Sequence, residues 1–169
     1  LMAWNADTTR MPATMHSQYL RHLFLDNDLS SGRFPVNGKP VALSDIDLPV
    51  FVVGTVTDHV APWRSVYKLH FLTDTEITFV LASGGHNAGI VSEPGHPHRN
   101  YQIATQPANS PYIAAEEWVA HTPVREGSWW TEWSAWLRTR SGPPVAPPRT
   151  GAPGRKVFGS APGTYVMQK

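Results

Sequence analysis

Two short, continuous apolar runs with a helix-sized interval between them constrain the fold more than any other feature. Residues 49–54 read Pro-Val-Phe-Val-Val-Gly, and residues 77–81 read Ile-Thr-Phe-Val-Leu. Such runs are typical of strands buried on both faces of a parallel sheet. Pro62 suits the first turn of a helix, and the apolar residues from Trp63 to Leu72 give that helix one apolar side. The sequence therefore predicts a β-α-β unit and an α/β fold.

Composition limits the class of protein. A chain of 169 residues, 41% of them hydrophobic, is long enough for one globular domain. No stretch approaches the roughly 18 apolar residues of a membrane-spanning helix, so no transmembrane segment and a cytoplasmic location are expected. With a net charge of +1, the chain has no overall electrostatic reason to bind nucleic acid. It contains no cysteine, which excludes disulfides, thiolate metal ligands and a cysteine nucleophile within these residues.

Three further helices are expected outside the β-α-β unit. Apolar residues recur about every four positions over residues 14–25, and this amphipathic helix also carries His16 and His22, for which the sequence indicates no partner. A short helix is expected over 114–122, and a Trp-rich helix capped by Ser128 over about 128–140. Its indole-rich stripe is interpreted first as packing. The segments around residues 30–40 have turn chemistry, and the Pro/Gly-rich, basic tail after residue 140 is expected to be extended or disordered.

Asp58 and His86 are the candidate catalytic residues. Each lies in a loop just after one of the two apolar runs. Because the carboxyl ends of parallel strands share one edge of a sheet, these loops should face a common crevice. An aspartate beside a histidine fixes the imidazole tautomer and stabilises the imidazolium that forms when the histidine accepts a proton. Asp and His residues are common in loops, however, so the spacing alone also fits a structural pair.

A nucleophile for such a pair is missing from the sequence. Neither G-x-S-x-G nor G-x-C-x-G occurs, and Ser83 lies on the wrong side of the His86 motif to be an elbow residue. Glycines 84, 85 and 89 around His86 would let the backbone approach a substrate closely. His59, next to Asp58, is assigned a supporting role. His96 and His98 flank Pro97 without further ligands at suitable spacing, so no metal site is predicted.

Five motifs follow one another along the chain: Trp4-Asn5-Ala6-Asp7 with Tyr19-Leu20-Arg21; Asp58-His59-Val60-Ala61-Pro62-Trp63; Gly85-His86-Asn87-Ala88-Gly89-Ile90-Val91; Gly127-Ser128-Trp129-Trp130 with Trp133 and Trp136-Leu137; and Ala161-Pro162-Gly163-Thr164-Tyr165-Val166. In order and spacing they resemble the polyhydroxyalkanoate (poly-β-hydroxybutyrate) synthases, and the Trp-Trp helix and the last motif resemble the single-subunit class I or II type. The resemblance covers essentially the whole chain.

This resemblance implies the C-terminal part of an α/β-hydrolase fold that lacks the nucleophile-bearing N-terminal part. Residues 1–33 would end the lid, 34–140 would belong to the catalytic domain, and 141–169 would form a C-terminal extension. An upstream cysteine would attack an (R)-3-hydroxyacyl-coenzyme A, with Asp58 as the acid and His86 as the base of a Cys-His-Asp triad. No cofactor is implied, because the coenzyme A thioester is the substrate. A homodimer at the surface of cytoplasmic polyester granules is also implied.

Two other functions stay open at this stage. The same acid and base could serve an α/β-hydrolase that uses water as acceptor, such as a thioesterase or a depolymerase. Alternatively, the piece could be a non-catalytic module that binds a granule or a partner through its Trp-rich helix and basic tail. Two strands alone would also expose an unpaired sheet edge, which argues against independent folding.

Overall fold

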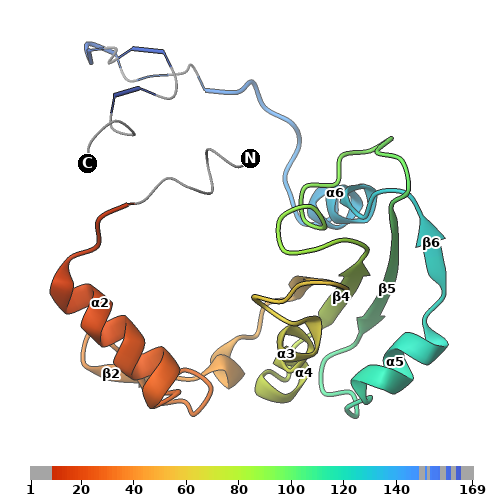
Figure 1. Cartoon of the computed structure of the whole chain (residues 1–169), viewed down its shortest axis with the longest axis horizontal. Coiled ribbons are helices and arrows are strands. Elements are labelled where there is room, and N and C mark those ends of the chain that lie inside the picture. The colour runs from red at the N-terminus through yellow and green to blue at the C-terminus, as the bar shows by residue number, and fades with distance from the viewer. Residues whose placement is uncertain (1–8, 149–150, 152, 157–158, 161–162, 165–169) are drawn as a thin grey trace.

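The computed structural model describes residues 9–148, 151, 153–156, 159–160 and 163–164, and Figure 1 shows them as a sheet with surrounding helices and a smaller helix and hairpin. The expected mixed α/β architecture is confirmed. In chain order, the elements are α2 (Ala13–Tyr19), η1 (Leu20–Leu25), β1 (Phe34–Val36), β2 (Lys39–Val41), η2 (Leu43–Asp45), β3 (Val50–Thr55), α3 (Trp63–Tyr67), α4 (Leu69–Leu72), β4 (Ile77–Ala82), β5 (Asn100–Gln106), α5 (Ala115–His121), β6 (Val124–Glu126) and α6 (Trp130–Arg138).

The central sheet has four strands in the order β3-β4-β5-β6. β3 and β4 are parallel, from Val50 opposite Ile77 to Thr55 opposite Ala82, which confirms the predicted β-α-β unit. β5 pairs antiparallel with β4, and β6 pairs antiparallel with β5. The expectation of only two strands was therefore wrong. The alternation of Tyr101, Ile103 and Thr105 is the period-2 signal that could have revealed β5.

The two predicted strands differ in burial. All six residues of β4 are buried, because the strand has a neighbour on each side and covered faces. In β3, only Gly54 and Thr55 are buried, and residues 50–53 are partly exposed. Val52 packs against the core on one face of the sheet, and Phe51 and Val53 pack against the core on the other, so the predicted burial on both faces is confirmed in part. The exposure that remains at residues 50–53 goes with the position of β3 at an edge of the sheet that the described residues form. Edge strands lack the cover that a second neighbour gives.

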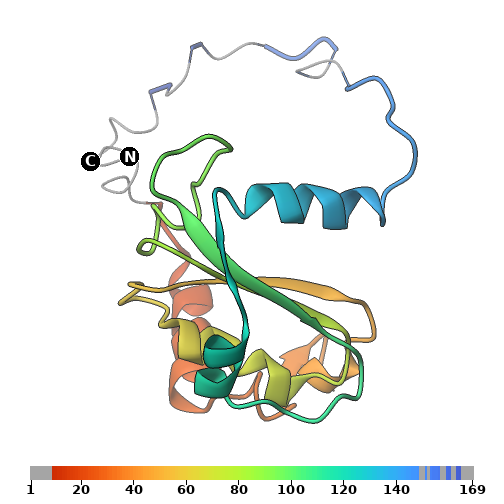
Figure 2. The same ribbon diagram turned by 90° about the vertical axis from the view of Figure 1, so that its right-hand side faces the viewer.

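Alternate side chains of β4 build the two halves of the core. Phe79 and its neighbours at 77 and 81 pack with Trp63 and Tyr67 of α3 and with Trp118 of α5. Val80 and Ala82 point the other way and pack with Tyr101 and Trp129. Phe79 is fully buried, which contributes about 2–3 kcal/mol. The helices α3 and α5 thus cover one face of the sheet, whereas α6 lies against the other (Figure 2).

The predicted helices form with adjusted ends. The helix expected from Pro62 to Leu72 is divided into α3 and α4 at Lys68. The helix expected over 14–25 begins as α2 and continues as the π-helix η1, which ends with the backbone N–H of Asp26 donating to the Arg21 carbonyl. The helices expected over 114–122 and 128–140 correspond to α5 and α6. Trp129 is buried, but Trp133 is 40% exposed, so the indole stripe packs only along part of its length.

A two-residue hairpin joins β1 and β2, where the sequence had indicated only turns. Asn37 and Gly38 have φ angles of 50° and 77°, the left-handed pair that a tight hairpin of this kind requires. Pro35 and Pro40 face each other across the hairpin. Proline cannot donate a ladder hydrogen bond, which is why the flanks did not look like strands in the sequence.

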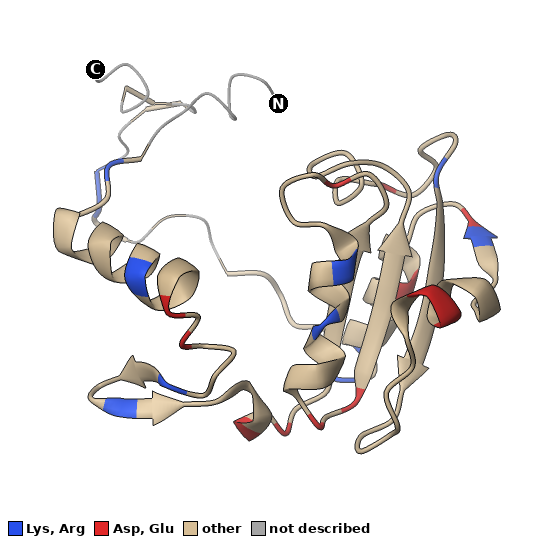
Figure 3. Cartoon of the chain, turned by 60° about the horizontal axis from the view of Figure 1, so that its bottom comes forward, with Lys and Arg blue, Asp and Glu red and all other residues tan. Residues whose placement is uncertain are grey.

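Charged residues of both signs are spread along the described part of the chain, as the coloured ribbon of Figure 3 shows. Arg64 of α3 pairs with Glu116 of α5 at 2.7 Å, and Arg125 of β6 pairs with Glu132 of α6 at 2.7 Å. Arg140, just after α6, pairs with Glu76, just before β4, at 2.8 Å. None of the helices in the described part of the chain is long and apolar enough to cross a membrane. Residues 4–7 and most of the last motif, at 161–162 and 165–166, lie outside the described residues.

Candidate active site

The sheet brings Asp58 and His86 together. Their loops leave the carboxyl ends of β3 and β4 side by side, because Thr55 and Ala82 are directly paired. Pairing continues past the strands, with the Thr57 N–H donating to the Gly84 carbonyl at 3.1 Å. The His86 Nδ1 atom then lies 2.9 Å from the Asp58 Oδ2 atom. The predicted juxtaposition is therefore present.

Asp58 is held by backbone as well as by His86. Its Oδ1 atom accepts hydrogen bonds from the backbone N–H groups of Val60 at 2.8 Å and Ala61 at 2.9 Å. The side chain is only 8% exposed. The Ala61 N–H contributes most to lowering the pKa of Asp58 from 3.8 to about 2; burial opposes this shift, and the hydrogen bonds from His86 and Val60 add to it. Asp58 is thus a carboxylate at neutral pH.

The carboxylate decides which nitrogen of His86 carries the proton. An ionised carboxylate can only accept hydrogen bonds, so the Nδ1 atom must be the donor in the 2.9 Å contact. In the neutral ring, the Nε2 atom then holds the lone pair. The His86 side chain is 45% exposed. This arrangement can take a proton from a thiol or hydroxyl at Nε2 and stabilise the resulting imidazolium.

Two glycines shape the His86 loop. Gly84 has a φ of 105°, a conformation that residues with side chains rarely adopt. A Cβ atom at Gly89 would lie 2.5 Å from the Thr55 Cγ2 atom and 2.8 Å from the Thr55 Cβ atom. The sequence suggested that Gly89 admits a substrate to the backbone. Instead, Thr55, the last residue of β3, occupies the space that a side chain at position 89 would need.

The other sequence candidates lie apart from this pair. His59 is exposed in the Asp58 loop, and its imidazole makes no hydrogen bond or ion pair with another residue in the described part of the chain. The Nδ1 atom of His96 lies 3.0 Å from the Pro97 carbonyl, and His98 has a φ of 59° in the same loop. Among the described residues, no group of three or more His, Cys, Asp or Glu could hold a metal ion.

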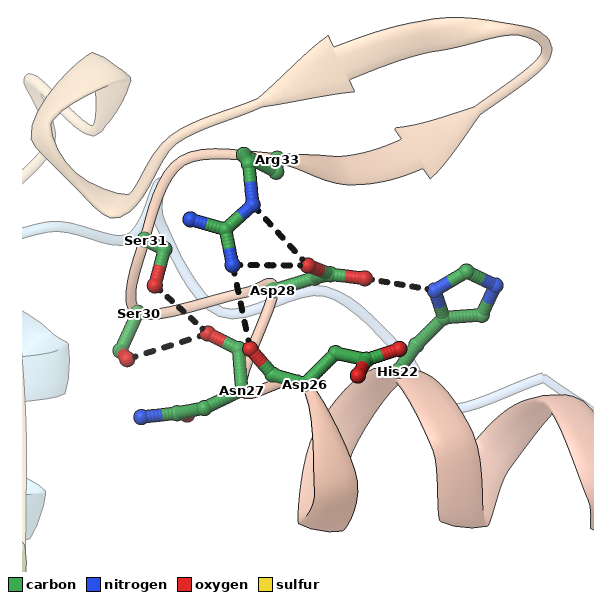
Figure 4. Close-up of polar contacts among 7 residues, drawn as sticks. All are labelled: His22, Asp26, Asn27, Asp28, Ser30, Ser31 and Arg33. Carbon is green, nitrogen blue, oxygen red and sulfur yellow. Dashed lines mark hydrogen bonds and ion pairs between the residues drawn. The ribbon is translucent and has the colours of Figure 1, made fainter.

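A second histidine and aspartate pair lies at the end of η1, as Figure 4 shows. The His22 Nδ1 atom is 2.7 Å from the Asp28 Oδ2 atom, so the expectation that His22 has no partner was wrong. Arg33 donates from Nε to the Asp28 Oδ1 atom at 3.2 Å and from a terminal nitrogen to the Asp26 carbonyl at 3.1 Å. The His22 hydrogen bond is the largest cause that lowers the pKa of Asp28, and the Arg33 charge adds to it. This cluster connects the helix to the hairpin.

Comparison with known proteins identifies relatives that align with the whole chain. The chain is 40% identical over 172 residues to a poly(3-hydroxyalkanoate) polymerase of Methylorubrum extorquens. It is 37% identical over 170 residues to the poly(3-hydroxyalkanoate) polymerase subunit PhaC of Rhizobium etli, and 35% identical over 171 residues to that of Cupriavidus necator. Each alignment covers 100% of the chain but only 27%, 26% and 28% of the respective relative. No protein-family model matches the chain.

These similarities extend over every motif that carried the resemblance. Identities of 35–40% along a complete chain, repeated in relatives from three organisms, confirm what the order and spacing of the motifs indicated. The chain is therefore related along its whole length to the poly(3-hydroxyalkanoate) polymerases and corresponds to a C-terminal portion of them.

Proposed function

We propose that the chain supplies the acid and base of a polyhydroxyalkanoate synthase, as the C-terminal part of its α/β-hydrolase domain. The observation that carries the proposal is the 2.9 Å contact between His86 and Asp58 at the carboxyl ends of adjacent parallel strands. Similarity to polymerases along the whole chain supports it. The strand order, with a parallel pair followed by antiparallel strands, is compatible with the end of a larger sheet that continues beyond β3.

The first chemical step is transfer of an acyl group to a cysteine supplied by polypeptide outside these residues. The His86 Nε2 atom takes the proton of that thiol, and the thiolate attacks the carbonyl carbon of an (R)-3-hydroxyacyl-coenzyme A. The bond from carbon to the coenzyme A sulfur breaks, and the leaving thiolate takes the proton from His86. Asp58 stabilises the transient imidazolium through Nδ1.

The second step extends the polyester. The Nε2 atom accepts the proton of a hydroxyl group, whose oxygen attacks the acyl-cysteine thioester, and the proton passes to the cysteine sulfur as it leaves. Coenzyme A and the polyester chain are therefore the partners of this site. No cofactor is part of the proposal, because the thioester already provides an activated acyl group. His59, exposed in the Asp58 loop, has a supporting role in orienting substrate.

The remaining assignments follow from the family. Residues 1–33 end the lid, 34–140 belong to the catalytic domain, and 141–169 form the C-terminal extension. The complete enzyme works as a homodimer in the cytoplasm, at the surface of polyester granules. Without the cysteine-bearing part, the chain is inactive. The relatives' names favour polymer formation over the two hydrolytic alternatives and over a non-catalytic fragment.

A chimeric polymerase tests the proposal. The present chain would replace the matching portion of the Methylorubrum extorquens relative, to which it is 40% identical. We expect the chimera to release coenzyme A and accumulate polyester, and His86→Gln or Asp58→Asn to stop both while the protein stays folded by circular dichroism. His121→Gln is the matched control, because the His121 imidazole hydrogen-bonds, among the described residues, to the Glu117 carbonyl of its own helix.

The outcomes separate the candidate functions. Release of coenzyme A without polymer would identify a thioesterase. A chimera that keeps its polymer yield with either substitution would leave the chain with a non-catalytic role. Failure of the unsubstituted chimera to release coenzyme A, in folded form, would count against the proposed function as a whole.

A further inference from the structure

The loop that carries His86 forms one isolated helical turn. The Gly89 N–H donates to the Gly85 carbonyl at 2.8 Å, and the N–H groups of Ile90 and Val91 donate to the Asn87 carbonyl at 3.2 and 2.9 Å. The last carbonyls of any helical turn have no N–H partner within it. In this turn, the carbonyls of residues 89 and 90, three and four positions after His86, are among them.

Three consecutive side chains of another segment supply the missing donors. The Trp129 Nε1–H donates to the Gly89 carbonyl at 3.0 Å, and the Trp130 Nε1–H donates to the Ile90 carbonyl at 2.9 Å. The Ser128 hydroxyl donates to the Ser92 carbonyl. These donors are about forty residues away in sequence, at the start of α6, so the contact is tertiary.

The donors are themselves held firmly. Ser128 is 5% exposed and Trp129 is 6% exposed. The Trp129 ring stacks on Phe51 of β3, with ring centroids 6.3 Å apart, and packs with Val80 and Tyr101. An indole is rigid and has one N–H donor in a fixed direction. The start of α6 therefore links the strand that precedes Asp58 to the turn that follows His86.

We propose that Ser128, Trp129 and Trp130 are positioning residues that hold the His86 turn where the Nδ1 atom of His86 keeps its hydrogen bond to Asp58 and the Nε2 atom is placed to accept a proton. This inference rests on the proposed function, and it gives the Gly-Ser-Trp-Trp motif a role beyond packing. The three side chains, called the indole clamp below, do not touch the reacting atoms. They act through the backbone of residues 89, 90 and 92.

Trp136 provides a matched control in the same helix. Its Nε1 atom is buried and has no hydrogen-bond partner among the described residues, while its ring packs on Phe51. Trp136→Phe therefore removes a comparable part of the ring without removing a hydrogen bond. Trp130→Phe removes the bond to Ile90 from a less buried position, so it keeps the test informative if Trp129→Phe does not fold.

The test combines two measurements. In the folded chimeric polymerase, Trp130→Phe should speed amide hydrogen exchange at Gly89 and Val91 by about three- to tenfold, whereas Trp136→Phe should not. In the chimera, Trp130→Phe should lower kcat by about tenfold to a hundredfold with little change in KM, since a small misplacement of a catalytic group costs rate rather than substrate binding. Ser128→Ala should act in the same direction.

The results separate the clamp from the proposed function. Equal exchange rates and equal kcat in the Trp130→Phe and Trp136→Phe proteins would overturn the clamp. Faster exchange in Trp130→Phe with an unchanged kcat would show that the clamp is a structural contact only, which would overturn its role in positioning His86. An inactive unsubstituted chimera would refute the proposed function, and with it the catalytic role of the clamp, while the exchange rates would still show whether the clamp holds the turn.

Discussion

Two regions of the molecule contain almost the same hydrogen bond in different surroundings. His86 and Asp58 at the sheet edge are joined from Nδ1 to Oδ2 at 2.9 Å, and His22 and Asp28 beside the hairpin are joined through the same atoms at 2.7 Å. The aspartate is shielded in each case, with 8% of the Asp58 side chain and 12% of the Asp28 side chain exposed. The bond alone therefore does not distinguish a catalytic pair from a structural one.

The difference lies at the other carboxylate oxygen. In Asp58, that oxygen accepts two backbone N–H groups, which are neutral, so the carboxylate keeps its charge for an imidazolium. In Asp28, it faces the Arg33 guanidinium, which already neutralises the carboxylate. A histidine gains less from a carboxylate whose charge is already shared. The groups that contact the second carboxylate oxygen are thus a better criterion for a catalytic role than the histidine–aspartate bond itself.

The largest expected contrast is in activity. In the chimeric polymerase, His86→Ala should lower the rate of coenzyme A release by about 10⁴-fold, because the base is lost. His22→Ala should change that rate by less than about twofold, since it lies away from the chemistry. Rate measurements at saturating substrate check this. A similar loss in the two variants would show that the second pair also takes part in the reaction.

The next contrast concerns the tautomer of His86. In Asp58→Asn, the amide oxygen should take the two backbone N–H groups, which turns the amide NH₂ toward the imidazole and makes Nδ1 an acceptor. The proton then moves to Nε2, and the rate should fall by up to about 10⁴-fold. Nitrogen-15 NMR of His86 reports the tautomer directly. An Nδ1–H signal that persists in the variant would contradict this account of the site.

A smaller contrast should appear in acid. The pKa of Asp58 is lowered chiefly by the Ala61 N–H, so His86→Ala should leave it well below 3.8. The pKa of Asp28 is lowered chiefly by His22, so His22→Ala should raise it toward 3.8. Carbon-13 titration of each carboxyl group measures both. The reverse order of sensitivity would show that backbone N–H groups do not dominate at Asp58.

These pKa shifts also give the sign of the effect on stability. A carboxyl group whose pKa is lowered by folding stabilises the fold at any pH above its pKa in the unfolded chain. This stabilisation is lost as the pH falls to the pKa in the folded protein. For Asp58, that loss occurs between pH 3.8 and about 2. Urea midpoints of the chimeric polymerase over this range should therefore fall less steeply with Asp58→Asn than without it.

The smallest expected effect is that of Arg33→Gln. Arg33 is 60% exposed, and exposed ion pairs contribute little to stability. The substitution should lower the urea midpoint less than His22→Ala does. The loss caused by Arg33→Gln should vanish near 1 M salt, where charges are screened within about 3 Å. A large, salt-independent loss would instead indicate that Arg33 acts through its hydrogen bond to the Asp26 carbonyl.

Particular residues show where prediction from the sequence succeeded and failed. The apolar run of β4 and the loops after β3 and β4 were sufficient to predict a parallel pair with Asp58 and His86 at one edge. The partner of His22 was missed, because Asp28 lies six residues away across the end of a π-helix, where helical periodicity no longer predicts neighbours. The backbone donors to Asp58 left only a weak signal, the tendency of aspartate to accept N–H groups two and three residues ahead.

The sequence by itself was sufficient to predict the parallel unit, the resemblance to the polymerases and the juxtaposition of Asp58 and His86, because hydrophobic periodicity and local motifs are properties of neighbouring residues. Only the tertiary structure decided that β3 is an edge of the sheet formed by the described residues, that Gly89 packs on Thr55, and that two indoles bind the His86 turn. Those features join residues about thirty to forty positions apart. Their geometry depends on how the sheet and α6 pack, which no local pattern encodes.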